Sequence, residues 1–140
     1  MTWSDRQEEH WEEPEHDRDQ EGAPRWPLDW RGLCPRERWL WFEQLWTDVC
    51  MLRDRYRLAV RAGWWENEVQ LEALAALAAW VARYDSGEWD DPPGKLGLLY
   101  DLERVSLLLR DGNDPFQPAR DRAAFVRHVI DLGSSPPAAT

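Results

Sequence analysis

Apolar residues recur at spacings of three and four along most of the chain, which is the pattern of amphipathic helices. The longest such stripe predicts a helix over residues 35–60. Its members are Phe42, Leu45, Val49, Leu52, Tyr56 and Ala59. Pro35 suits the first position of this helix because its missing N–H needs no partner there, which leaves Cys34 at the N-cap. Gly63 is expected to end the helix in a left-handed conformation.

Three further helices are predicted downstream. The second begins near Glu66, and its centre over residues 73–82 carries no polar side chain, so we expect it in the middle of the domain. Its large apolar residues fall on one broad face: Val69, Leu74, Leu77, Trp80, Val81 and Tyr84. The third, over about residues 95–110, has a main apolar stripe of Leu98, Leu102, Val105 and Leu109 and a second set on its other side, Leu96, Tyr100 and Leu107. The fourth opens at Pro118 and runs to about Leu132.

No stretch shows convincing two-residue alternation, so the predicted fold is all-α, a four-helix single domain over residues 25–132. The proline- and glycine-rich segment that leads into the first helix carries Trp26 and Trp30, and we expect both indoles to lie on the helical body. Residues 133–140 are rich in proline and small residues and are predicted to form a short disordered tail.

The N-terminal segment, residues 1–24, holds nine acidic side chains and two arginines. Such a composition buries too little apolar surface to offset the entropy lost on ordering, so we expect a disordered acidic tail. Trp3 and Trp11 interrupt the acidic residues, a pattern that disordered docking segments also show. The tail is therefore interpreted as a solvated segment, with docking as the alternative.

The charge and the cysteine content of the chain limit the classes of function that it can have. The formal net charge is −10, with 27 acidic and 17 basic residues, which disfavours non-specific binding to nucleic acid or to anionic membranes. Cys34 and Cys50 match no metal-binding or redox spacing, and no secretory signal or membrane-spanning run is visible. The expectation is a reduced, cytoplasmic protein that has no membrane segment.

Catalytic chemistry finds little support in the sequence. The chain has no glycine-rich phosphate loop, no HExxH and no GxSxG motif. His128 is expected on the polar side of the last helix, and neither cysteine has a histidine close to it in sequence. A metal site at His10 and His16 is conceivable, but a disordered tail provides no fixed geometry for it. We therefore expect no enzymatic activity, no metal and no other cofactor.

Four arginines gather near the end of the first predicted helix. Arg53, Arg57 and Arg61 follow a four-residue period and would line up on one face, with Arg55 offset from them. Cations at a helix C-terminus complement its dipole, which is the simpler interpretation. The alternative is a clamp for phosphate or carboxylate groups, since arginine binds both in a bidentate manner. The protein's own acidic tail is then the nearest candidate ligand.

Eleven tryptophans are the most unusual feature of the composition. Trp39 and Trp46 lie on a flank of the first helix, where packing against the lead-in segment is favoured over a partner site. Trp64 and Trp65 are adjacent at the corner between the first two helices, so they cannot face the same side of a regular helix. We predict that one indole turns inward while the other covers the corner or meets a partner. Two equally buried indoles would refute this division of roles.

A further pattern extends from residue 28 to about residue 110. It comprises Asp29, Trp30, Leu33, Arg36, Glu37, Arg38, Leu52, Arg53, Arg55, Tyr56, Trp64, Trp65, Leu71, Leu74, Leu77 and Trp80. In these residues the segment resembles a set of short actinobacterial proteins of unknown function, often encoded near plasmid or integrative-element genes. In those proteins a cysteine often precedes the aromatic pair and a histidine follows it, whereas this chain has Gly63 and Asn67. The resemblance implies a helical fold and a mobile-element setting, but no thiol or metal chemistry.

The leading hypothesis is a small non-enzymatic adaptor or regulator that binds a protein partner, or a second copy of itself, through tryptophan-rich surface. The predicted partner-binding residues are Trp39, Trp46, Trp64 and Trp65 as aromatic anchors, with Arg53, Arg55, Arg57 and Arg61 at the rim. The alternative is a nucleic-acid-linked regulator, either through arginine contacts to phosphate or through an acidic surface that mimics DNA.

Overall fold

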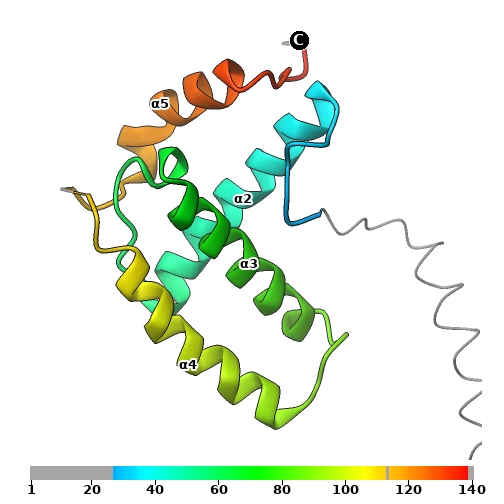
Figure 1. Cartoon of the computed structure of the whole chain (residues 1–140), viewed down its shortest axis with the longest axis vertical. Coiled ribbons are helices and arrows are strands. Elements are labelled where there is room, and N and C mark those ends of the chain that lie inside the picture. Colours follow the sequence, from blue (N-terminus) through cyan, green and yellow to red (C-terminus); the bar gives the residue numbers. More distant parts are fainter. Residues whose placement is uncertain (1–26, 113, 139–140) are drawn as a thin grey trace, which may run out of the picture.

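The computed structural model describes residues 27–112 and 114–138 (Figure 1). Within them the chain forms four α-helices and one short 3₁₀ turn, which confirms the predicted all-α class. The elements are α2 (Pro35–Tyr56), η1 (Trp64–Glu66), α3 (Glu68–Asp85), α4 (Pro92–Leu108) and α5 (Pro118–Asp131). The predicted acidic tail over residues 1–24, and Trp26 in the lead-in segment, lie outside the described residues.

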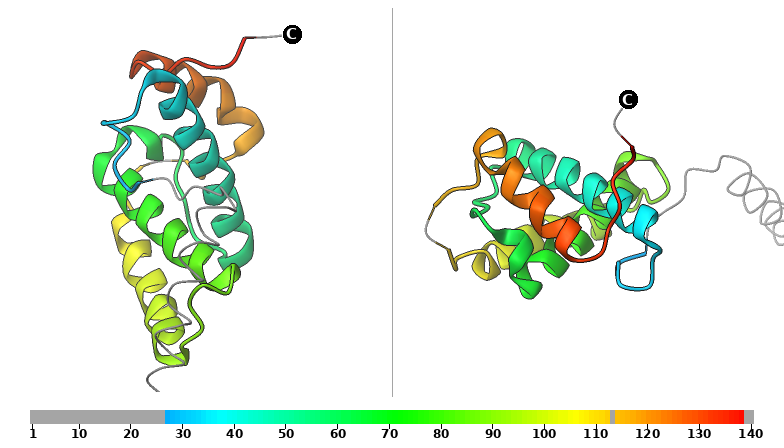
Figure 2. Two further views of the ribbon diagram at one scale, coloured as in Figure 1. Left: turned by 90° about the vertical axis from the view of Figure 1, so that its right-hand side faces the viewer. Right: turned by 90° about the horizontal axis from the view of Figure 1, so that it is seen from above.

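The α3 helix occupies the middle of the domain, as its alanine- and leucine-rich centre predicts. It packs against α2, against η1 and against α4, whereas α5 packs against α2 (Figures 1 and 2). Its inward face is fully closed, and Leu74 and Val81 have no exposed surface. The α4 helix packs chiefly against α3, so much of its surface is left to solvent.

The first helix is shorter than predicted. It ends at Tyr56, because Arg57 takes a left-handed conformation at φ 57°. Gly63 is also left-handed, at φ 79° as predicted, but it precedes η1 and does not end α2. The next residues after Arg57 are not helical and bury Leu58 and Val60, while an isolated antiparallel bridge joins Arg61 to Pro115. The backbone therefore lacks the last predicted helical turn and forms hydrogen bonds with the segment before α5 instead. The expected helix over residues 35–60 is wrong in its last turn.

Local capping explains where the other helices begin. The Asn67 side chain accepts a hydrogen bond from the Gln70 N–H at 3.1 Å and caps α3. The Asp91 carboxylate accepts from the Gly94 N–H at 2.7 Å and caps α4. This cap, with prolines in the first turn, starts α4 at Pro92, three residues before the predicted start at residue 95.

The domain extends past the predicted boundary at residue 132. Ser134 is buried, and its hydroxyl donates to the Val129 carbonyl at 2.7 Å. The Ser135 N–H donates to the Pro35 carbonyl at 2.9 Å, which ties the end of α5 to the start of α2. The predicted disordered tail therefore cannot begin at residue 133, because these hydrogen bonds dock the chain as far as Ser135. No helix within residues 27–112 and 114–138 has the length and apolar character needed to cross a membrane.

Candidate functional site

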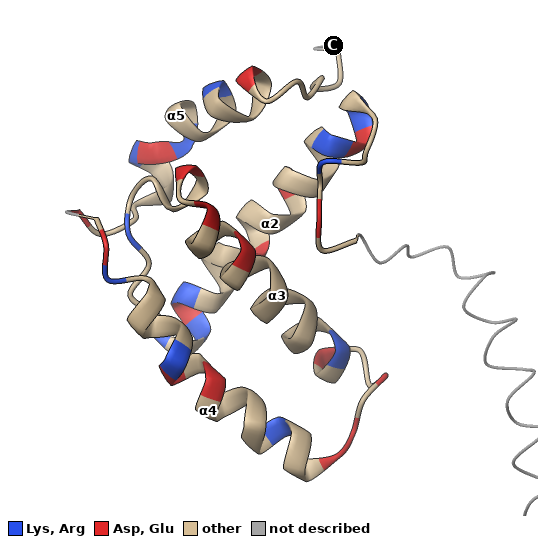
Figure 3. Ribbon diagram, viewed as in Figure 1, with Lys and Arg blue, Asp and Glu red and all other residues tan. Residues whose placement is uncertain are grey.

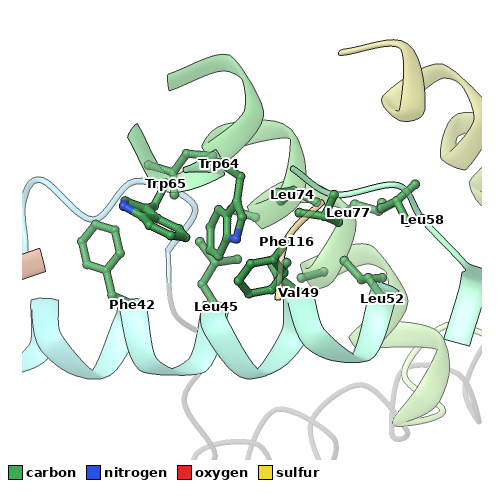
Figure 4. Close-up of a cluster of buried hydrophobic side chains, with 14 of the residues drawn as sticks. Phe42, Leu45, Val49, Leu52, Leu58, Trp64, Trp65, Leu74, Leu77 and Phe116 are labelled. Carbon is green, nitrogen blue, oxygen red and sulfur yellow. The ribbon is translucent and has the colours of Figure 1, made fainter. Parts of the chain in front are cut away.

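The tryptophan pair at the corner is part of the core. Trp64 has no exposed surface and Trp65 is 4 % exposed, so the predicted division into one inward and one outward indole is wrong. Successive residues of a 3₁₀ turn point about 120° apart. Both indoles lie among other buried apolar side chains, with Phe116 close to Trp64 (Figure 4). Phe125 from α5 lies 5.8 Å from the Trp64 ring and 5.5 Å from the Trp65 ring, so both directions are closed.

The flank tryptophans of α2 are also enclosed. Trp39 is 8 % exposed, and Trp46 packs 4.6 Å from Phe125 and 5.0 Å from Phe116, measured between ring centroids. The aromatic rings that Trp46 contacts thus belong to η1, to α5 and to the segment before α5, and Trp30 of the lead-in segment is not among them. From that segment Trp30 contacts Phe42 instead, at 5.2 Å.

Three of the tryptophans predicted as partner anchors, Trp46, Trp64 and Trp65, thus join α2, η1 and α5 in a shared aromatic cluster, and Trp39 is buried in the same hydrophobic core. Their side chains offer little surface to another molecule in this structure, which buries Trp39, Trp64 and Trp65 and leaves Trp46 only partly exposed. Neither indole N–H of Trp64 and Trp65 has a hydrogen-bond acceptor among the described residues. The two indoles instead contact aromatic rings, and they meet each other edge to face with an angle of 80° between their planes.

The predicted arginine strip does not form, because the helix ends before Arg57 and Arg61. Arg53 pairs with Asp54 at 2.9 Å and donates to the Phe116 carbonyl at 3.1 Å. Arg55 pairs with Asp85 at the end of α3, at 2.8 Å. Acidic residues are interspersed with the basic ones around the end of α2 (Figure 3). The guanidinium groups of Arg53 and Arg55 therefore hold neighbouring segments of this chain.

An open groove of about 850 Å³ lies where the chain turns from α3 into α4. Trp80 and Tyr84 on α3 and Trp89 in the following loop provide its aromatic side chains. Two alanines of α3 leave room between them, and Pro27 and Leu28 of the lead-in segment complete the lining. The lead-in is held in place by Trp41, whose indole N–H donates to the Pro27 carbonyl at 2.6 Å.

Cationic side chains brace the aromatic rings of the groove. The Arg83 guanidinium lies 4.7 Å from the Trp89 ring centroid, and Lys95 Nζ lies 5.4 Å from that of Tyr84. Tyr84 and Trp89 meet edge to face at 5.8 Å. These contacts fix the orientation of two rings that remain accessible from outside.

One hydrogen-bonded unit joins the groove to the start of α4. The Tyr84 hydroxyl donates to Asp91 at 3.0 Å, and this bond, together with the Gly94 N–H, lowers the pKa of the Asp91 carboxyl. Burial raises the pKa of Tyr84, and the bond to Asp91 raises it further. A side chain at position 94 would collide with the Tyr84 hydroxyl and the Asp91 carboxylate, so any residue larger than glycine there would displace this hydrogen-bonded pair.

Sequence reasoning missed this groove. It placed Trp80 in the core, whereas the indole is only half-buried and lines the groove wall. Trp89 received no role, although it stands alone between Glu88 and Asp90 in a polar loop. An isolated tryptophan among acidic residues was the available signal, but only the packing of the loop on Tyr84 shows where its ring lies.

The described residues contain no group of three or more histidine, cysteine, aspartate or glutamate side chains placed to hold a metal ion. No family model, curated protein or solved structure matches the chain. The resemblance to short actinobacterial proteins therefore stays a prediction.

Asp48 on α2 provides a test of electrostatics away from the groove. Burial raises the pKa of its carboxyl above the ordinary value of 3.8, although a hydrogen bond from Gln44 at 3.0 Å partly opposes this. Because the folded-state pKa is raised, the stability linked to protonation is present below pH 3.8 and is lost as the pH rises through the folded-state pKa. We expect Asp48→Asn to raise the Tm at pH 7, with the difference vanishing in acid, as measured by circular dichroism melts across pH.

The matched control is Asp54→Asn on the same helix. It removes the same charge from a chain of net charge −10, but Asp54 is exposed and pairs with Arg53, so its Tm should not rise. Equal increases for both variants would attribute the effect to net charge and contradict the role of burial at Asp48.

Proposed function

We propose that this chain is a non-enzymatic adaptor whose aromatic groove binds an extended, proline-containing segment of a partner protein with a basic residue beside the proline. The observation that carries the proposal is the open groove of about 850 Å³ with Trp80, Tyr84 and Trp89 on its walls. Its volume falls in the range of about 300–1,000 Å³ that is common for binding pockets. The proposed partner-binding surface therefore consists of the accessible side chains Trp80, Tyr84 and Trp89, in place of the buried tryptophans that the sequence suggested.

Aromatic rings on a groove wall favour proline-rich ligands for a physical reason. A polyproline II segment is extended, exposes its backbone carbonyls and loses little conformational entropy on binding, and grooves lined by tryptophan and tyrosine recognise it. In this groove Arg83 and Lys95 hold the rings from the side, so little reorganisation is needed on binding.

Charge selects the residue that flanks the proline. The loop between α3 and α4 contributes three acidic side chains, Glu88, Asp90 and Asp91, against the two basic side chains at the groove, Arg83 and Lys95, so the rim is net acidic. Glu88 pairs with Arg83 at 3.8 Å, and Asp91 accepts hydrogen bonds from Tyr84 and Gly94, while Arg83 and Lys95 contact aromatic rings. A ligand with an arginine or lysine at its edge is therefore complementary to this rim, and an acidic ligand such as residues 1–24 is not. The form of the nucleic-acid alternative that relies on arginine contacts to phosphate finds less support, because Arg53 and Arg55 are paired with acidic residues.

The test uses synthetic peptides as probes. A panel of proline-rich peptides with a flanking arginine is titrated against the full chain, and binding is followed by NMR shifts of the Trp80 and Trp89 indole N–H signals. Each peptide has two controls, in which the prolines become alanine or the arginine becomes glutamate. We expect both changes to weaken binding, and we expect Trp89→Ala to raise the Kd of the best peptide by about 30-fold or more.

The matched control variant is Ile130→Ala on α5, which removes exposed apolar surface away from the groove. Its Kd should equal that of the wild type. The proposal fails if no peptide of the panel shifts the groove signals, or if Trp89→Ala and Ile130→Ala bind the peptides equally well.

A further inference from the structure

The α4 helix has a second apolar stripe on the side opposite its core contacts. Leu98 and Leu102 face α3 and are buried, whereas Leu96, Tyr100 and Leu107 are 57 %, 69 % and 55 % exposed. At 100° per residue these three side chains fall within about 40° of one another, and the line between them passes through Glu103. Among the described residues α4 packs chiefly against α3, and a continuous apolar band on the other side of such a helix indicates an interface.

Two more leucines widen the band. Leu99 and Leu108 are 42 % and 47 % exposed and lie on its two edges. The other large exposed apolar residues of the domain are scattered over several elements: Leu28, Leu40, Val69, Trp89 and Ile130. The outer face of α4 is thus where exposed apolar surface concentrates.

We propose that this face is the contact between two copies of the chain, with the two α4 helices antiparallel across a twofold axis. The stripe has a leucine at each end, and its midpoint lies between Tyr100 and Glu103, whose side chains complement each other. An antiparallel pair therefore places Leu96 against Leu107 of the other copy, and Tyr100 against Glu103 of the other copy. The Tyr100 hydroxyl can then donate to the Glu103 carboxylate, so the one charge within the stripe gains a hydrogen bond instead of being buried alone. A surface that complements itself in this way meets the requirement of a twofold dimer.

Charge also favours a second copy at this face. The whole chain carries a net charge of −10, so two copies repel each other on average. Within α4 the charged residues are Lys95, Asp101, Glu103 and Arg104, which sum to zero. Asp101 and Arg104 lie 3.7 Å apart on one edge of the stripe, and the 82 % exposed side chain of Arg104 is within reach of Asp101 of the other copy. The neutral helix is thus the face on which self-association meets least repulsion.

The dimer leaves the groove open, because Trp80 and Tyr84 lie on α3 and the proposed contact uses the far side of α4. The two proposals are therefore independent. One concerns peptide binding in the groove and the other concerns dimer formation through α4, and either can fail alone.

The first experiment measures mass by sedimentation equilibrium of the full chain over a concentration series. We expect the wild type to rise from 16.6 kDa toward twice that value. The double variant Leu96→Glu/Leu107→Glu should raise the dimer dissociation constant by at least about 30-fold. Val69→Glu is the matched control, because Val69 is as exposed as Leu96, at 57 %, but lies on α3. A wild type that stays at 16.6 kDa, or equal loss of dimer in both variants, overturns the proposal.

The second experiment tests orientation by disulfide formation, in a background where Cys34→Ser and Cys50→Ala remove the native thiols. Leu96→Cys chains are mixed with Leu107→Cys chains under mild oxidation. Positions 96 and 107 are about 16 Å apart along one helix, so an antiparallel pair cross-links only the mixed dimer. Cross-linking of Leu96→Cys chains to one another, as in a parallel pair, overturns the antiparallel arrangement, as does the lack of a mixed product.

Discussion

Trp64→Ala is expected to lower the free energy of unfolding by about 3–5 kcal/mol, the range typical of a fully buried tryptophan. The indole has no exposed surface and lies 5.6 Å from Trp65, 6.0 Å from Phe116 and 5.8 Å from Phe125. Removing it opens a cavity where η1 joins α2, α3 and α5, and the surrounding rings cannot collapse far enough to fill it. The measurement is urea unfolding followed by tryptophan fluorescence and circular dichroism.

Trp89→Ala provides the comparison for this variant. Trp89 is 38 % exposed and contacts Tyr84 and Arg83 at the edge of the groove, so its loss should cost about 1 kcal/mol or less. We expect the two substitutions to separate the stability of the fold from the proposed peptide binding, since Trp64 is buried in the core and Trp89 lines the groove. Similar losses of stability in both variants would contradict the assignment of Trp64 to the core.

Arg38→Ala is expected to lower the free energy of unfolding by about 2–4 kcal/mol, the second-largest effect. The guanidinium donates to the Leu132 carbonyl at 2.6 Å, to the Arg31 carbonyl at 3.0 Å and to the Leu33 carbonyl at 3.1 Å. It also lies 5.1 Å from the Trp30 ring. One side chain of α2 therefore holds both the lead-in segment and the end of α5, and its loss leaves three carbonyls without their charged donor.

The conservative variant tests the geometry of this contact. Arg38→Lys keeps the charge but lacks the planar fork that reaches several carbonyls at once, so we expect it to restore less than half of the lost stability. Arg36→Ala, at an exposed position on the same turn, should change stability by no more than about 0.5 kcal/mol. Full recovery with lysine would show that charge, and not the forked hydrogen bonds, carries the effect. Unfolding in urea measures all three variants.

Helix content and helix starts were readable in the sequence. The three- and four-residue spacing of apolar residues identifies four helices, and prolines at positions 35 and 118 mark the first turns of α2 and α5. The buried middle of α3 also follows from composition, because residues 73–82 offer no polar side that could face water. Both faces of α4 are visible in the same way, with Leu98 on one and Leu96 on the other. These features depend on neighbours along the chain, which is why local pattern suffices for them.

The end of α2 and the roles of individual tryptophans were not readable. Arg57 leaves the helix because the residues after it pair with Pro115, more than fifty positions away in sequence. The same holds for the aromatic side chains. Phe125 closes over Trp64 and Trp65, while the loop that carries Trp89 turns back onto Tyr84 and opens a groove beside Trp80.

Sequence alone therefore determined which segments are helical and which helix is central, since hydrophobic periodicity expresses contacts that repeat at every turn. Tertiary structure decided which indoles are buried, because an aromatic side chain is equally suited to a core and to an interface. The choice depends on whether a ring from a distant element covers it. That covering contact is a property of the folded chain and not of the residues adjacent to the tryptophan.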